Sequence, residues 1–527
     1  MTYLFNNSKI RSKINIVVLV SRMLKKSSLF LVWIFFLKGL CFGSPLLETE
    51  DLNLSLGTYF RTDAVSFKNV ADLDSSNKDD HTAYLGIDYS LSFSADFKNQ
   101  GPKFYLKLER NGPYDYSAPV FIHNTLINSG GRIGKYHDSQ LLPQVEEFWA
   151  DSALFDKFRI KAGLYIYEVG NGFSLNGSYE NYGLTLYRET ENIFWRVYYC
   201  RPDLVYKNHL GPRIDQEQEQ EQKYEPNAAN FFATDAKINL GNQVFWPYIG
   251  VLADYTSPKK RGDSLFSAPI KRDILGTFGT AWEFKGKDFS LQLEAAHNFG
   301  YAKSASSEYK DVQHTGYMFY SGLDYVMGKF NPSLQFLLCS GNKASLDMAG
   351  DPDVLYAAGK NRAFSYYSPS NGNLGDTISS NNVEMLPIVA MGGGYGLNYG
   401  VPRPKTFSSG DFENLIMPSI GFDFNATNKL SLGLYGYYLR SFTRPVGTLN
   451  GEGKYLCQEL GYETDLFIDY QLNKNILVSL LGGYFFPGRY YKELRDDTTG
   501  SLFSPFVRGD GSPDCAYQLE LSMELKF

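Results

Sequence analysis

Apolar and polar residues alternate along most of this chain with a period of two. From Tyr517 to Phe527 every odd position is apolar or aromatic, and every even position is polar or charged. A β-strand directs successive side chains to opposite faces, so this segment predicts a strand with one apolar and one polar face. The same alternation recurs in residues 85–97, 104–109 and 289–296.

About 18 such segments follow one another along the chain, and most have the roughly 9–11 residues that a strand needs to cross a bilayer. An even number of strands is typical of bacterial barrels. We therefore predict an all-β fold, a transmembrane antiparallel β-barrel. The predicted strands begin near residues 52, 83, 103, 145, 158, 182, 193, 232, 244, 275, 289, 315, 330, 414, 430, 458, 476 and 516.

The segments between the predicted strands alternate in length. Short ones such as 98–102 and 472–475 are rich in Asn, Gly and Lys, and long ones such as 111–144 and 201–231 lie between them. Short periplasmic turns and long extracellular loops alternate in this way in bacterial barrels. The longest loop, 341–413, either folds into the lumen as a constriction or covers the surface, and the sequence leaves both open.

The N-terminal region has the features of an export signal. Two lysines precede the apolar run 29–37, and small residues follow at 43–44. The run is too short to span a bilayer as a helix, which favours a cleaved signal over an anchor. We predict a signal peptide over 1–43, with Met23 as an alternative start, and a barrel over 44–527.

Composition and charge fit this interpretation. Aromatic residues make up 16% of the chain, as expected for a barrel with aromatic girdles at both membrane interfaces. Residues 1–43 hold 7 of the 51 Lys and Arg and none of the 57 Asp and Glu, which leaves about −13 on the rest of the chain. A net negative charge disfavours binding to nucleic acid.

Motifs for catalysis, metals or cofactors do not stand out. The six histidines are not spaced as a metal-binding pair, and we find no P-loop, dinucleotide or Gly-x-Ser-x-Gly motif. We predict a protein that is not an enzyme and needs no cofactor. The alternative, if the protein is an enzyme, is a barrel hydrolase with a Ser/His pair on adjacent strands.

Four cysteines follow the predicted signal peptide, and their spacing fits no zinc site. Cys457 and Cys515 would both lie at outer strand ends, two strands apart. An exported chain can form disulfides. The sequence therefore allows either a disulfide between these two residues or free buried thiols.

Charged residues occupy the polar face of the predicted strands, which would point into the barrel. A charge on the lipid face costs about 2–4 kcal/mol near the bilayer midplane, so this placement is informative. Paired charges would brace the wall, whereas others would line an aqueous path and select solutes by sign. The pore-lining candidates are Arg61, Lys107, Glu109, Glu147, Asp151, Arg159, Lys161, Arg196, Asp235, Lys237, Glu294, Glu463, Asp465, Asp469, Glu520 and Glu524.

Three stretches resemble the alginate export family of outer-membrane porins. Residues 461–466 and 484–488 are similar to that family's penultimate strand pair, with a Gly-x-Glu-x-Asp-Leu run and an aromatic-Pro-Gly end. Residues 340–342 resemble the top of a strand before a long loop, and 148–172 resemble a strand hairpin. In that hairpin the family has Gly-Arg-Gln, where this chain has Gly-Leu-Tyr at 163–165. The resemblance implies an 18-stranded monomeric barrel whose lumen arginines attract uronate carboxylates.

These observations predict a channel in the bacterial outer membrane that passes hydrophilic solutes passively or exports an alginate-type polysaccharide. Its partners would be the lipid bilayer, the solute and, through the strand ending in Phe527, the barrel-assembly machinery. A structural or adhesin-like barrel is the alternative, and it would act through loops 111–144, 201–231 and 341–413. A soluble exported β-protein is the remaining alternative.

Overall fold

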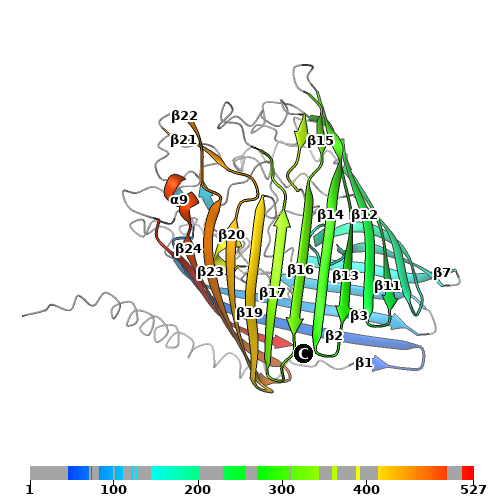
Figure 1. The fold of residues 1–527 in the computed structure, drawn as a ribbon. Coiled ribbons are helices and arrows are strands. Elements are labelled where there is room, and N and C mark those ends of the chain that lie inside the picture. The colour runs from blue at the N-terminus through cyan, green and yellow to red at the C-terminus, as the bar shows by residue number, and fades with distance from the viewer. Residues whose placement is uncertain are drawn as a thin grey trace, which may run out of the picture.

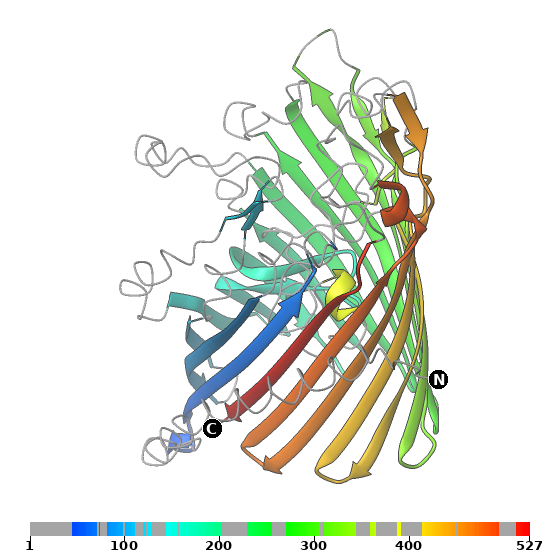
Figure 2. The same ribbon diagram turned by 90° about the vertical axis from the view of Figure 1, so that its left-hand side faces the viewer.

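In the described part of the chain, 18 antiparallel strands form the closed wall of a β-barrel (Figures 1 and 2). Neighbouring strands pair in chain order, and the ring closes because β2 pairs with both β3 and β25. The computed structural model describes residues 45–70, 73, 82–98, 101–110, 120–122, 125–127, 144–155, 157–201, 229–255, 270–305, 307, 310–343, 359–364, 387–391, 414–449, 452–494 and 513–526.

The predicted all-β class, the antiparallel barrel and the count of about 18 strands are confirmed. The largest difference in a strand start is at β9, which begins at residue 176 and not at 182. The wall strands are β2 (Leu52–Lys68), β3 (Thr82–Phe97), β4 (Lys103–Arg110), β7 (Gln144–Phe155), β8 (Phe158–Glu168), β9 (Asn176–Glu189), β10 (Ile193–Cys200), β11 (Ala229–Leu240), β12 (Gln243–Asp254), β13 (Ile270–Lys285), β14 (Phe289–Ser304), β16 (Tyr317–Tyr325), β17 (Phe330–Cys339), β19 (Leu415–Thr427), β20 (Leu430–Arg440), β23 (Glu459–Asn473), β24 (Ile476–Pro487) and β25 (Ala516–Lys526).

Shorter elements, which the alternation does not predict, lie between the wall strands. β1 pairs with β2, and β15 joins the edge of β14 and also pairs in parallel with β18. β5–β6 and β21–β22 are separate hairpins. These elements are β1 (Pro45–Glu48), β5 (Val120–Ile122), β6 (Thr125–Ile127), β15 (Val312–His314), β18 (Lys360–Asn361), α8 (Ile388–Met391), β21 (Val446–Leu449), β22 (Glu452–Tyr455) and α9 (Arg489–Leu494).

The outer face of the wall exposes large apolar side chains, and the inner face buries polar side chains together with aromatic and aliphatic ones. On β25 the polar side chains of Gln518, Glu520 and Ser522 are buried, whereas the apolar side chains between them are partly exposed. Large apolar residues such as Phe148 and Ile420 are 58% and 64% exposed on the outer face. Such a continuous apolar exterior matches the hydrocarbon of a bilayer, and a closed ring leaves no unpaired strand edge in it.

The strand that closes the ring, β25, is the segment whose alternation of apolar and polar residues predicts the barrel. β25 pairs with β2 from Tyr517 opposite Lys68 to Lys526 opposite Tyr59. This long register brings the first and last wall strands together as tightly as neighbours elsewhere in the ring. Phe527, on which the prediction of barrel-assembly binding rests, lies outside the described residues.

Connections at the two ends of the barrel differ. At the end where β25 terminates, neighbouring strands are separated by short segments such as 241–242 and 474–475. At the opposite end lie β15, β21, β22 and α9 (Figure 1). Within the described residues, no helix is long and apolar enough to cross a membrane.

Candidate functional site: the inner wall of the barrel

The charged residues singled out in the sequence all lie on wall strands, on the face opposite to the exposed apolar side chains. Fourteen of the sixteen separate into four groups by their contacts. One group braces the seam where the ring closes, a second forms a basic and aromatic wall, and a third binds chain segments inside the barrel. The pair Lys107–Glu109 on β4 forms a fourth group, an ion pair within one strand. Of the other two, Glu147 accepts from Nε1 of Trp149 at 3.2 Å, and Asp469 lies on β23 outside these groups.

The seam between β2 and β25 is braced by Arg61. Its Nε donates to Asp63 Oδ1 at 2.6 Å, and its Nη2 donates to Glu520 Oε1 at 2.6 Å. Glu524 lies 4.0 Å away from Nη1. All four side chains are buried or nearly so, and an ion pair in that setting requires a complete set of partners. The cluster therefore has a bracing role, and Asp63 is a member that the candidate set lacks.

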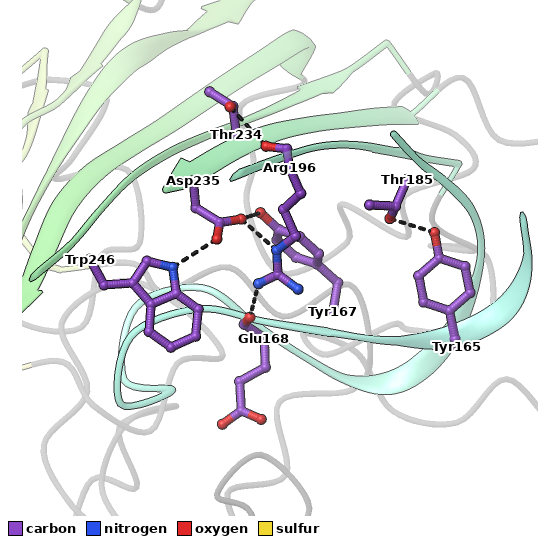
Figure 3. A network of polar contacts seen from close by, with 8 residues as sticks. All are labelled: Tyr165, Tyr167, Glu168, Thr185, Arg196, Thr234, Asp235 and Trp246. Atoms are coloured by element: carbon purple, nitrogen blue, oxygen red, sulfur yellow. Dashed lines mark hydrogen bonds and ion pairs between the residues drawn. The ribbon is translucent and has the colours of Figure 1, made fainter. Parts of the chain in front are cut away.

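A second group centres on Arg196 of β10 (Figure 3). Its Nε donates to Asp235 Oδ2 at 2.6 Å, and its Nη2 donates to the backbone oxygen of Glu168. Asp235 also accepts from the hydroxyl of Tyr167 at 2.8 Å and from Nε1 of Trp246 at 2.7 Å. The guanidinium lies 4.3 Å from the ring centre of Tyr167. Arg196 is thus held in one orientation by its carboxylate and its aromatic neighbour.

Two lysines on the same side of the barrel have aromatic neighbours. Lys161 Nζ lies 4.0 Å from the ring centre of Trp149 and 4.3 Å from that of Tyr165. Lys237 Nζ lies 4.9 Å from the ring centre of Trp246. Among the described residues neither lysine has a carboxylate within ion-pair distance. A cation over an indole face is attracted by the ring but keeps its full charge.

Arg159 completes this side of the barrel. Its Nε donates to Asp151 Oδ1 at 2.7 Å, and Tyr187 donates to the other oxygen of Asp151 at 2.5 Å. We call the residues Arg159, Lys161, Arg196 and Lys237 the cationic wall. The aromatic neighbours of the cationic wall follow the same inward alternation as the charges, since Trp149 lies two positions after Glu147 and Trp246 lies two positions before the buried Tyr248.

Glu294 of β14 binds a segment of chain inside the barrel. Its Oε2 accepts from the backbone N–H of Asn171 at 2.7 Å. Its Oε1 accepts from the hydroxyl groups of Ser174 at 2.9 Å and Tyr248 at 2.8 Å. The segment 169–175 joins β8 to β9, yet these contacts hold it against β12 and β14, which lie several strands further round the ring. It therefore crosses the interior next to the inner wall.

Glu463 and Asp465 of β23 bind a second internal segment. Asp465 Oδ2 accepts from the backbone N–H of Ile388 at 2.9 Å. The two oxygens of Glu463 accept from the backbone N–H groups of Val389 at 2.5 Å and Ala390 at 2.7 Å. These donors belong to α8, which lies against the inner face of β23, β24 and β25 (Figure 2, yellow).

The position of α8 bears on the longest connection, 341–413. Its residues 387–391 lie inside the wall, as expected for an inward constriction, and most of the remainder is outside the described residues. The carboxylates of Glu294, Glu463 and Asp465 have no exposed surface or almost none. We therefore assign them an anchoring role in place of direct contact with a solute.

The two cysteines considered for a disulfide, Cys457 and Cys515, are free. They precede β23 and β25, and β24 lies between these strands. Two strand spacings amount to about 9–10 Å, beyond the roughly 7 Å that a disulfide can bridge between α-carbons. Of the two alternatives that the sequence allows, free thiols describe the structure, and both side chains are partly buried. The described residues also contain no group of three or more His, Cys, Asp or Glu that could hold a metal ion.

Comparison with known proteins finds similarity at the level of folded structure. No protein-family model and no curated protein matches the chain. Pseudomonas aeruginosa OccK11 (OpdR) is 11% identical, with a TM-score of 0.45 over 92% of this chain and 99% of that one. The outer membrane protein opdK from the same species is 10% identical, with a TM-score of 0.45 over 90% and 99%. A BenF-like porin from Pseudomonas fluorescens Pf-5 is 9% identical, with a TM-score of 0.46 over 90% and 98%. We draw no conclusion about solutes from similarity at this level.

Proposed function

We propose that this protein is a passive channel for small hydrophilic solutes in the bacterial outer membrane. The observation that carries the proposal is the distribution of side chains on the closed ring. Apolar residues such as Phe148 and Ile420 are exposed outside, and charged residues such as Arg196 and Asp235 are held inside. Buried ion pairs seldom add more stability than apolar side chains of the same size, so the many charges in the interior favour a path that water and solutes enter.

The internal segments would narrow this path. Segment 169–175 is held to Glu294 on one side of the barrel, and α8 is held to Glu463 and Asp465 on another. A solute would pass these segments and the cationic wall, so both its size and its charge would affect passage. Fixed cations in a lumen favour anions when their charge is not neutralised by a carboxylate.

A polysaccharide exporter of the alginate type is the second candidate. The observation that favours it is the cationic wall, because Lys161 and Lys237 lie among aromatic rings and have no carboxylate partner in the described residues. A polyanion such as a uronate chain would be attracted to such a wall. The residues 461–466 that resemble that family include the two anchors of α8.

The zero-current potential of refolded protein in a planar bilayer across a salt gradient tests both candidates. We expect stepwise channels with a preference for anions, because Lys161 and Lys237 of the cationic wall have no carboxylate partner in the described residues. Cation preference or no preference would contradict the polyanion candidate and leave a general or neutral-solute channel. A bilayer that remains without current would contradict the channel and favour the structural or adhesin-like barrel.

A further inference from the structure

A pocket lies on the outer face of the barrel, at the end opposite the short turns. It has a volume of about 650 Å³ and lies where β23 and β24 meet α9 and the β21–β22 hairpin. Its lining combines three basic side chains, those of Lys454, Arg489 and Lys492, with the aromatic side chains of Tyr462 and Phe486. None of these residues has contacts with the inner wall groups described above.

The aromatic part of the pocket marks the level of a membrane interface. Tyr462 and Phe486 are 53% and 47% exposed on the outer face. Each packs at a tilt against an outward neighbour, Tyr462 against Tyr438 at 5.0 Å and Phe486 against Tyr484 at 4.8 Å between ring centres. Exposed aromatic rings on a barrel exterior gather where acyl chains give way to headgroups.

Three basic side chains of the pocket face two acidic ones, Glu459 and Glu493, which leaves a net charge of one positive unit. Glu493 forms an ion pair with Arg489 at 3.1 Å and also accepts from the backbone N–H of Cys457, so both of its oxygens are used. Lys454 and Lys492 are exposed and have no carboxylate partner within the described residues. Two exposed ammonium groups therefore line the same pocket as the aromatic rings.

We propose that this pocket binds the phosphate groups of an outer-leaflet glycolipid, a phosphorylated and multiply acylated sugar of the lipid A type. The lysines would contact its phosphates, and its acyl chains would run down the exposed apolar wall below Tyr462 and Phe486. A soluble anion could bind the lysines, but it has no acyl chains to contact the aromatic rings and the apolar wall. The proposal rests on the proposed function, because it requires the long-loop end of the barrel to face the outer leaflet.

The test measures binding of diphosphorylated lipid A to the full-length protein in detergent by native mass spectrometry. The variant is Lys454→Gln/Lys492→Gln, and the matched control is Lys287→Gln/Lys474→Gln, which removes two exposed lysines from short turns at the opposite end. Each lysine near an anionic headgroup contributes about 1 kcal/mol. We therefore expect roughly tenfold to thirtyfold weaker binding for the variant and unchanged binding for the control.

Two further arms identify the ligand. Dephosphorylated lipid A should bind the unaltered protein as weakly as the diphosphorylated form binds the variant. Equal binding of both lipids, or equal loss in the control, would overturn the phosphate site. Displacement of lipid A by millimolar inorganic phosphate would overturn the glycolipid and leave a simple anion site. The variant should conduct like the unaltered protein in planar bilayers, so a failure of lipid binding is distinguishable from the absence of a channel.

Discussion

Lys161 and Lys237 differ from the other basic residues of the inner wall. Arg61, Arg159 and Arg196 each donate to a carboxylate, and that contact both orients the side chain and cancels its charge. The two lysines instead lie over indole rings. Among the basic residues of the inner wall, the charge that no carboxylate cancels is therefore concentrated on these two lysines.

We expect Lys161→Gln/Lys237→Gln to move the zero-current potential toward cation preference with little effect on stability. Glutamine is one atom shorter than lysine and stays polar, so it can still pack on the rings while the positive charge is lost. Lys287→Gln/Lys474→Gln serves as the control, because it removes the same charge from exposed turns. An equal change in the potential for both variants would mean that the protein's overall charge, and not the cationic wall, sets selectivity.

Gly461 has a backbone conformation that other residues rarely adopt. Its φ is +141°, and a Cβ atom there would lie 2.2 Å from the backbone oxygen of Phe486 on the paired strand. We expect Gly461→Ala to lower the free energy of unfolding by about 1–3 kcal/mol. Gly436→Ala on neighbouring β20 is the matched control, because the nearest atom to its Cβ would be 3.8 Å away. Urea titration followed by the gel mobility of the folded form measures both, and equal midpoints would contradict the explanation.

At the scale of elements, the wall strands are predictable from sequence and the internal segments are not. Period-two alternation is a local property, so it locates strands such as β14 and β25 and assigns their inward face. The segment 169–175 has no such period, and its position depends on Glu294, more than a hundred residues later. α8 depends in the same way on Glu463 and Asp465. The pore-lining candidates chosen from the sequence include all three carboxylates. Their anchoring role could not be predicted, because it depends on the position of the segments that they bind.

Removing these anchors should release α8. Glu463→Ala/Asp465→Ala deletes the acceptors of three backbone N–H groups, and without them the segment loses the contacts that hold it to β23. We expect larger and more variable single-channel conductance in planar bilayers. Asp469→Ala is the control, because Asp469 lies on the same face of β23 and is not one of the α8 anchors. If the double variant conducts like this control, α8 does not narrow the path.

At the scale of the whole molecule, closure of the ring distinguishes a membrane barrel from a soluble exported β-protein. A soluble sandwich buries most of its large apolar side chains, whereas this ring exposes many of them on its outer face and buries polar and charged side chains together with an aromatic cluster inside. Because β2 pairs with β25 over ten residue pairs, every wall strand has two neighbours and the backbone needs no hydrogen bonds from water. The closed ring is therefore both compatible with hydrocarbon and resistant to opening.

This closure leads to a prediction for the intact protein. We expect the unheated protein to migrate faster in a detergent gel than the boiled protein, because detergent coats the apolar exterior without opening the ring. The difference should persist in reductant, since Cys457 and Cys515 are free and no disulfide joins them. The protein should also remain with the outer-membrane fraction after carbonate washing. A single mobility at all temperatures, together with release into the soluble fraction, would contradict a membrane barrel. That result would favour the alternative of a soluble exported β-protein.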